Sequence, residues 1–191
     1  MSGGRKCRLY IVGSAAVSLG LLCQNSRGVE SATAWPKASA KPWPEADELF
    51  HRDSRWRGGD GASSVALGED RVLWLFGDSF VSNQPVDHRK ETKGVNNSLG
   101  IQRGRNPETA TLKCYWNDKQ EKPRAFFESD EDSWLWPSAG ILIDDHLLIL
   151  MMRLERADKG LGFKLIGNDG FLVKNPQDVP DDWTMEPLIV P

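Results

Sequence analysis

Two aspartates stand in glycine-rich surroundings at the two ends of one short segment. Gly58 to Phe80 reads GGDGASSVALGEDRVLWLFGDSF, in which Asp60 and Asp78 each follow a glycine. Two neighbouring carboxylates are the minimum set for glycoside hydrolysis, because one protonates the leaving oxygen while the other activates water or attacks the sugar. The residue types alone therefore make this segment a candidate catalytic centre.

The spacing within the segment predicts that the two acids meet. A three-residue loop at 68–70 would close an antiparallel hairpin in which Leu67 faces Arg71. The same pairing carried outward makes Asp60 face Asp78, with Cβ atoms about 4.5–5.5 Å apart. Like charges opposed in this way destabilise a sheet, so a chain tolerates them most readily where a site uses them.

Two other roles stay open for these aspartates. Gly-Asp is a common turn dipeptide in which the carboxylate bonds nearby backbone groups, and clustered carboxylate oxygens also suit Ca²⁺. Elsewhere the three histidines are scattered, so no metal site is predicted. The sequence holds no phosphate loop, dinucleotide fingerprint or nucleophile elbow, so no cofactor is predicted either.

Short strand patterns separated by turn residues run from Trp56 onward, with almost no helical periodicity. Residues 61–76 consist of a small-residue start, a strand, a tight turn and a very apolar strand, and residues 139–152 repeat this layout around a turn at Asp144-Asp145. A further turn is predicted at Gly167 to Gly170. Two successive four-stranded antiparallel units predict an all-β fold made of propeller blades or sandwich halves.

The N-terminal part of the sequence has the pattern of an export signal. A basic start precedes the apolar run Leu9 to Cys23, and Ala32-Thr33-Ala34 offers a cleavage site. We therefore expect residues 1–34 to be a signal peptide, 35–55 a leader, 56–191 the domain, and the mature chain to be secreted or periplasmic without a membrane span. A lipoprotein site at Cys23 is the alternative.

Charge and cysteine content limit the partners and the means of stabilisation of the mature chain. Four of the 24 basic and one of the 27 acidic residues lie in residues 1–34, which leaves 20 and 26, a net charge of −6. This balance excludes a typical nucleic-acid partner, which requires a basic face. Cys114 is then a lone cysteine, and its apolar surroundings predict a core residue.

Four segments, WRGGDGASSVAL, RVLWLFGDSF, NNSLGIQ and WLWPSAGILIDDHLLIL, resemble a family of secreted five-bladed β-propellers that includes endo-D-arabinanases. The resemblance runs from about Trp56 to the end of the chain and favours propeller blades over a sandwich. It implies a glycoside hydrolase that acts on furanosyl linkages of an arabinan-like polysaccharide or oligosaccharide. By motif match, Asp60 and Asp78 are the acidic pair, with Asp60 favoured as base or nucleophile.

Other residues follow from the same resemblance and from their position. Asn97 and Trp136 are implied to line the cleft, and Trp56 lies near its end with an aromatic face that can stack on a sugar. Glu128 is a candidate third carboxylate within the acidic run ESDED. A complete five-bladed ring needs more chain, so the sequence is expected to hold the N-terminal blades, with a possible C-terminal half missing. The alternatives are a non-catalytic carbohydrate-binding or scaffold propeller and a truncated inactive product.

Overall fold

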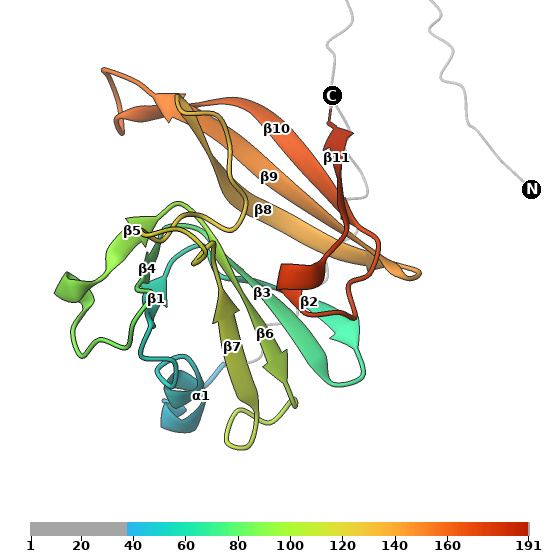
Figure 1. The fold of residues 1–191 in the computed structure, drawn as a ribbon. Coiled ribbons are helices and arrows are strands. Elements are labelled where there is room, and N and C mark those ends of the chain that lie inside the picture. Colours follow the sequence, from blue (N-terminus) through green and yellow to red (C-terminus); the bar gives the residue numbers. More distant parts are fainter. Residues whose placement is uncertain (1–37, 191) are drawn as a thin grey trace, which may run out of the picture. The chain divides into compact units, whose positions relative to one another are not determined.

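The computed structural model describes residues 38–190, of which Pro42 onward forms one compact unit. Strands dominate this part of the chain (Figure 1). The helical elements are α1 (Pro44–Leu49), η1 (Arg89–Glu91) and η2 (Pro180–Asp182). The strands are β1 (Trp56–Gly59), β2 (Ser63–Gly68), β3 (Arg71–Phe76), β4 (Ser79–Val81), β5 (Lys93–Val95), β6 (Ser98–Arg103), β7 (Thr111–Tyr115), β8 (Ser133–Ile143), β9 (His146–Arg156), β10 (Phe163–Val173) and β11 (Met185–Ile189).

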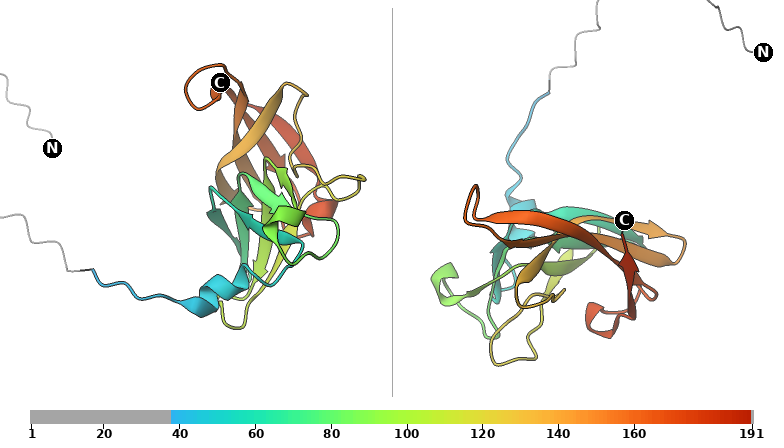
Figure 2. Two further views of the ribbon diagram at one scale, coloured as in Figure 1. Left: turned by 90° about the vertical axis from the view of Figure 1, so that its left-hand side faces the viewer. Right: turned by 90° about the horizontal axis from the view of Figure 1, so that it is seen from above.

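Two four-stranded antiparallel sheets form the body of this unit, as the repeated layout predicts. Their strand orders are β2-β3-β6-β7 and β8-β9-β10-β11, and a third sheet has the order β1-β4-β5. The all-β class is confirmed, and none of these sheets closes on itself. In the right-hand view of Figure 2 the β8–β11 sheet lies in front of the β2–β7 sheet.

The β2–β3 hairpin has the predicted register but a different tip. Ser63 pairs with Leu75 and Ala66 with Val72, as the sequence predicts. Gly68 rather than Leu67 pairs with Arg71, because a bulge follows Ala66. The loop is therefore two residues long, with both Glu69 and Asp70 at positive φ (48° and 58°), the backbone that matches the twist of paired strands in a tight hairpin.

The predicted turn at Gly167 to Gly170 is wrong. β10 continues through this segment as one strand, with an irregularity only between Leu165 and Gly167. Asp169 pairs with Met151 on one side and Ile189 on the other. The ladders from both neighbouring strands thus hold an extended backbone where the local sequence favours a turn.

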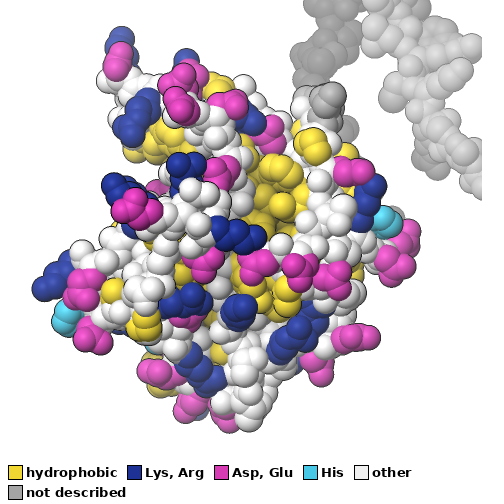
Figure 3. All heavy atoms as spheres, in the orientation of Figure 1, with side chains coloured by type: hydrophobic (Ala, Val, Ile, Leu, Met, Phe, Trp, Pro, Cys, Tyr) yellow, Lys and Arg dark blue, Asp and Glu magenta, His cyan; other side chains and the backbone are white. Residues whose placement is uncertain are grey.

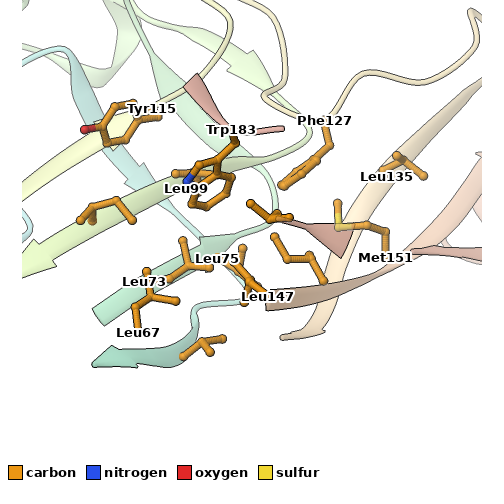
Figure 4. Close-up of a cluster of buried hydrophobic side chains, with 14 residues drawn as sticks. Leu67, Leu73, Leu75, Leu99, Tyr115, Phe127, Leu135, Leu147, Met151 and Trp183 are labelled. Carbon is orange, nitrogen blue, oxygen red and sulfur yellow. The ribbon is translucent and has the colours of Figure 1, made fainter. Parts of the chain in front are cut away.

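The main core lies between the two four-stranded sheets, where strands of each contribute alternate side chains (Figure 4). Leu73 and Leu75 of β3 face Leu147 and Met151 of β9, and all four are fully buried. The sheets approach most closely at β2 and β8. A Cβ added at Gly140 of β8 would lie 2.7 Å from Cγ2 of Val65, so this contact requires glycine.

The opposite face of the β2–β7 sheet carries a second core. Phe76 and Trp56 pack there with ring centroids 4.7 Å apart, and Phe50 packs edge-on against Trp74. Cys114 is buried in this cluster, and burial raises the pKa of its thiol, as suits an unreactive core residue. α1 and Phe50 belong to the segment 35–55 expected to be a leader. Leu49 is buried and Phe50 is half-buried against the second core, so the second half of this segment packs on the domain.

The predicted signal peptide at 1–34, including Cys23, lies outside the described residues. Among residues 38–190 no helix has the length and apolar character needed to cross a bilayer.

Candidate functional site

Asp60 and Asp78 lie where one long hairpin passes from one sheet into another. The pairing of β2 with β3 ends at Ser63 and Leu75, and the pairing of β1 with β4 resumes at Gly59 and Ser79. Between these pairs the Asp60 N–H donates to the Asp78 carbonyl at 3.0 Å, and the Gly77 N–H donates to the Asp60 carbonyl at 2.8 Å. Asp60 thus bonds two successive residues of the other strand, so the backbones of Asp60 and Asp78 lie side by side in the hairpin.

The side chain of Asp60 lies directly over the backbone of Gly77. A Cβ added at Gly77 would be 2.5 Å from Oδ1 of Asp60, closer than any real contact. The glycine in the motif LFGDS therefore makes room for the carboxylate of the neighbouring strand. Asp60 is exposed to solvent, whereas Asp78 is half-buried.

Trp136 holds the carboxylate of Asp78. Its indole Nε1–H donates to Oδ1 of Asp78 at 2.9 Å. Trp136 lies on β8, so this bond joins the hairpin of the first sheet to the second sheet. The bond therefore fixes the orientation of the Asp78 carboxylate.

The predicted cleft residues Asn97 and Trp56 lie in the interior. Asn97 is fully buried; its Nδ2 donates to the carbonyls of Phe127 (3.0 Å) and Leu135 (2.9 Å), and its Oδ1 accepts from the Phe127 N–H at 2.8 Å. Trp56 is 4% exposed and donates to Oγ of Ser98. Contact with a ligand does not fit either placement, because both polar groups already have partners within the chain.

The neighbour of Asn97 is the residue that reaches the surface. Asn96 is exposed and lines an open groove together with Trp134 and Phe163. Successive residues of an extended chain point to opposite sides, so the pair Asn96-Asn97 contains one surface and one interior amide. The sequence NNSLG does not predict which of the two asparagines is exposed.

Trp136 belongs to a cluster of three aromatic side chains at one end of the β8–β11 sheet. Its ring lies 4.9 Å from that of Phe163 and 6.2 Å from that of Trp134, both edge to face. Such pairs contribute about 0.5–1.5 kcal/mol beyond area burial. Phe163 was absent from the predicted site because it is distant in sequence and enters only through the pairing of β9 with β10.

Arg153 fixes the segment that leads into β8. It donates to both carboxylate oxygens of Asp169 (2.8 and 3.0 Å), to Oδ2 of Asp130 and to Oγ of Ser133. The hydrogen bonds to Asp169 raise the pKa of Arg153 above its usual value. The acidic run therefore has a structural anchor at Asp130, while Glu128 is exposed and pairs with Arg124.

The described residues contain no group of three or more metal-ligating side chains. The arrangement around Asp60 and Asp78 instead offers two carboxylates, an oriented indole and adjoining aromatic rings. These groups can bind hydroxyl-rich ligands and exchange protons with them.

Residues 45–185 match the family model described as Domain of unknown function (DUF5005). The chain belongs to this family. The matched residues include most of α1, the strands β1 to β10 and the candidate site.

The DUF5005 chain is also similar to a crystal structure from Bacteroides ovatus ATCC 8483 that is described as a "putative hydrolase". The TM-score is 0.57 and the sequence identity 19%, over 73% of this chain and 40% of that one. The chain thus spans about two-fifths of the length of that protein, and the likeness is one of fold. A comparison with curated proteins found no match.

Gly77→Ala tests the close approach of Asp60 to the opposite strand. The new methyl group is expected to push the exposed carboxylate of Asp60 away, at a stability cost of about 1 kcal/mol or less because that side chain can rotate. Thermal unfolding should therefore change little, while any activity or ligand binding that uses Asp60 should fall. Gly94→Ala is the matched control, since a Cβ there meets nothing within 4 Å. Equal function in both variants would argue against a role for Asp60.

Proposed function

We propose that this chain is part of an exported glycoside hydrolase that acts on furanosyl linkages of a polysaccharide. The observation that supports this most strongly is the joint placement of Asp60 and Asp78 on one hairpin, with Trp136 bonded to Asp78. A carboxylate pair beside aromatic rings is the equipment that glycoside hydrolysis requires. The resemblance of the motifs around both aspartates to arabinan-cleaving propellers supports the substrate class.

The two aspartates take different parts in this proposal. The indole N–H of Trp136 holds the carboxylate of Asp78 in one orientation, which suits a base or nucleophile. Asp60, without such a donor among the described residues, is then the acid. This reverses the assignment favoured from sequence, where the position of Asp60 before β2 suggested the base.

We further propose that the two four-stranded sheets are successive blades of a five-bladed propeller. Each has four antiparallel strands in chain order, although β4 and β5 join another sheet between β3 and β6. The two sheets approach most closely at their first strands, β2 and β8. Ile141 and Ile143 of β8 are each 53% exposed and Leu188 of β11 is 37% exposed. Figure 3 shows one side of the molecule, on which hydrophobic side chains reach the surface over the β8–β11 sheet. Further blades, from additional chain or another subunit, would cover such surfaces.

A non-catalytic carbohydrate-binding protein is the second candidate. It is favoured by the exposure of Asp60, because a general acid normally works in a partly desolvated place. In this case Asp60 and Asp78 would accept hydrogen bonds from sugar hydroxyls without cleaving a linkage.

Incubation of the purified chain with arabinan, arabinogalactan and related polysaccharides tests the proposal. The release of new reducing ends by the parent, and not by a D60N/D78N double variant prepared in the same way, is the expected result. Binding without release would favour the second candidate. Neither binding nor release with any polysaccharide would overturn both.

A further inference from the structure

An open groove with a volume of about 790 Å³ lies next to Trp136 but outside the acidic pair. Its size falls within the range of about 300–1,000 Å³ typical of ligand sites. One side is formed by Asn96 and the segment leading into β8, the other by the ends of β9 and β10, which lie together in Figure 1. The lining residues are Asn96, Glu131, Asp132, Ser133, Trp134, Glu155, Arg156, Gly162 and Phe163.

Two aromatic rings form the apolar part of this groove. Trp134 and Phe163 lie edge to face with ring centroids 6.1 Å apart. Within residues 38–190, Nε1 of Trp134 has neither a hydrogen-bond partner nor contact with solvent. A buried donor without an acceptor is costly, and a ligand hydroxyl that reached it after a small rotation of the ring would relieve that cost.

Polar side chains of both charges and one amide surround these rings. Asn96, Glu131, Asp132 and Arg156 make no side-chain hydrogen bond or ion pair to another described residue. Glu155, in contrast, pairs with Lys164 at 2.7 Å. The groove therefore presents unengaged donors and acceptors beside aromatic rings.

This mixture indicates a neutral ligand rich in hydroxyl groups. Glu131 and Asp132 would repel a polyanion, and the guanidinium of Arg156 offsets part of their attraction for a cation. Sugar hydroxyls both donate and accept, so they match carboxylate, amide and guanidinium groups at once. The apolar faces of a sugar ring can in turn pack on Trp134 or Phe163.

The groove is continuous with the candidate site through Trp136. Trp136 packs against Phe163 at 4.9 Å on one side and bonds Asp78 on the other. We infer that the groove binds sugar units of the same chain whose linkage lies at Asp78, so that the substrate is a long oligosaccharide or polymer held over several units. This inference rests on the proposed function for its sugar class and extends it to chain length.

Calorimetric titration of the full chain with an arabino-disaccharide and an arabino-octasaccharide tests the inference. Asp78→Asn serves as the parent for titration, since hydrolysis would otherwise consume the ligand. The octasaccharide should bind more tightly than the disaccharide. The double variant Asp78→Asn, Trp134→Ala should bind the octasaccharide about tenfold more weakly than Asp78→Asn alone, as for truncation of an aromatic anchor. Its affinity for the disaccharide should be unchanged.

Trp43→Ala is the matched control, because Trp43 is 51% exposed and lies outside the groove. If Trp134→Ala fails to fold, Asn96→Ala replaces it in the titration, because Asn96 is an exposed residue of the groove and its removal breaks no aromatic contact. No octasaccharide binding, or equal affinities for both ligand lengths, would overturn the inference. Length-dependent binding without hydrolysis by the wild-type chain would support the groove as a sugar site and refute the catalytic proposal. Hydrolysis by the wild-type chain without length-dependent binding would support the catalytic proposal and refute the groove as a sugar site.

Discussion

Replacement of Asn97 by alanine is expected to destabilise the domain by about 3 kcal/mol or more. The side chain is fully buried and satisfies two carbonyls and one N–H, at Phe127 and Leu135. Alanine removes all three hydrogen bonds, and each buried group that loses its partner costs about 1–3 kcal/mol. Because Leu135 lies on β8 and Asn97 precedes β6, the change also cuts a link between the two four-stranded sheets.

Thermal and urea unfolding measure this effect, with Asn96→Ala as the matched control. Asn96 is exposed and makes no side-chain hydrogen bond within the described residues, so its removal should change stability by about 0.5 kcal/mol or less. For a chain of this size the loss at Asn97 corresponds to a fall in Tm of roughly 6–12 °C. If both variants unfolded alike, the amide of Asn97 would not be the internal link described, and a surface role would have to be reconsidered.

Asp78→Asn is expected to lower hydrolysis of a responsive polysaccharide by about a hundredfold or more. A positioned acid or base contributes about 10²–10⁴-fold to such a reaction, and the amide can neither carry the negative charge nor act as a base. The variant is nearly isosteric. Asparagine keeps an oxygen that can accept the hydrogen bond from Nε1 of Trp136, so the orientation of β8 against the hairpin should persist.

Initial rates of reducing-end release, together with Tm, separate chemistry from folding in this variant. The expected pattern is a large loss of rate with a Tm close to that of the parent. Asp145→Asn, at the exposed turn between β8 and β9, is the control for a change of net charge and should retain the parent rate. Full activity of Asp78→Asn would remove Asp78 from the chemistry, although not from sugar binding.

Short-range patterns predict much of the fold correctly. Alternating apolar residues and a compact turn place Ser63 opposite Leu75 and carry the pairing out to Gly59 and Ser79. The positions of Asp60 and Asp78 on one hairpin follow from that register, because each strand residue has only one partner opposite it. The resemblance of GGDGA and LFGDS to known motifs adds a hypothesis about chemistry to a geometry that the pattern already predicts.

Other expectations fail where a local signal competes with a distant partner. The run Gly167-Asn168-Asp169-Gly170 has the composition of a turn, yet hydrogen bonds from β9 and β11 keep it extended. Trp56 has the residue type of a sugar-binding platform, but Phe76 and Ser98 enclose it. In each case the deciding neighbour lies far away in sequence or on another strand.

The amino-acid sequence by itself determined the all-β class, the two successive sheets and the position of Asp60 and Asp78 on one hairpin, because period-two alternation and tight turns act between residues close along the chain. Only the tertiary structure decided that Asn97 points inward while Asn96 faces the groove, that Trp136 bonds Asp78, and that Phe163 joins Trp134. These contacts join different strands and sheets, and the packing of one sheet against another selects which of two adjacent side chains is buried.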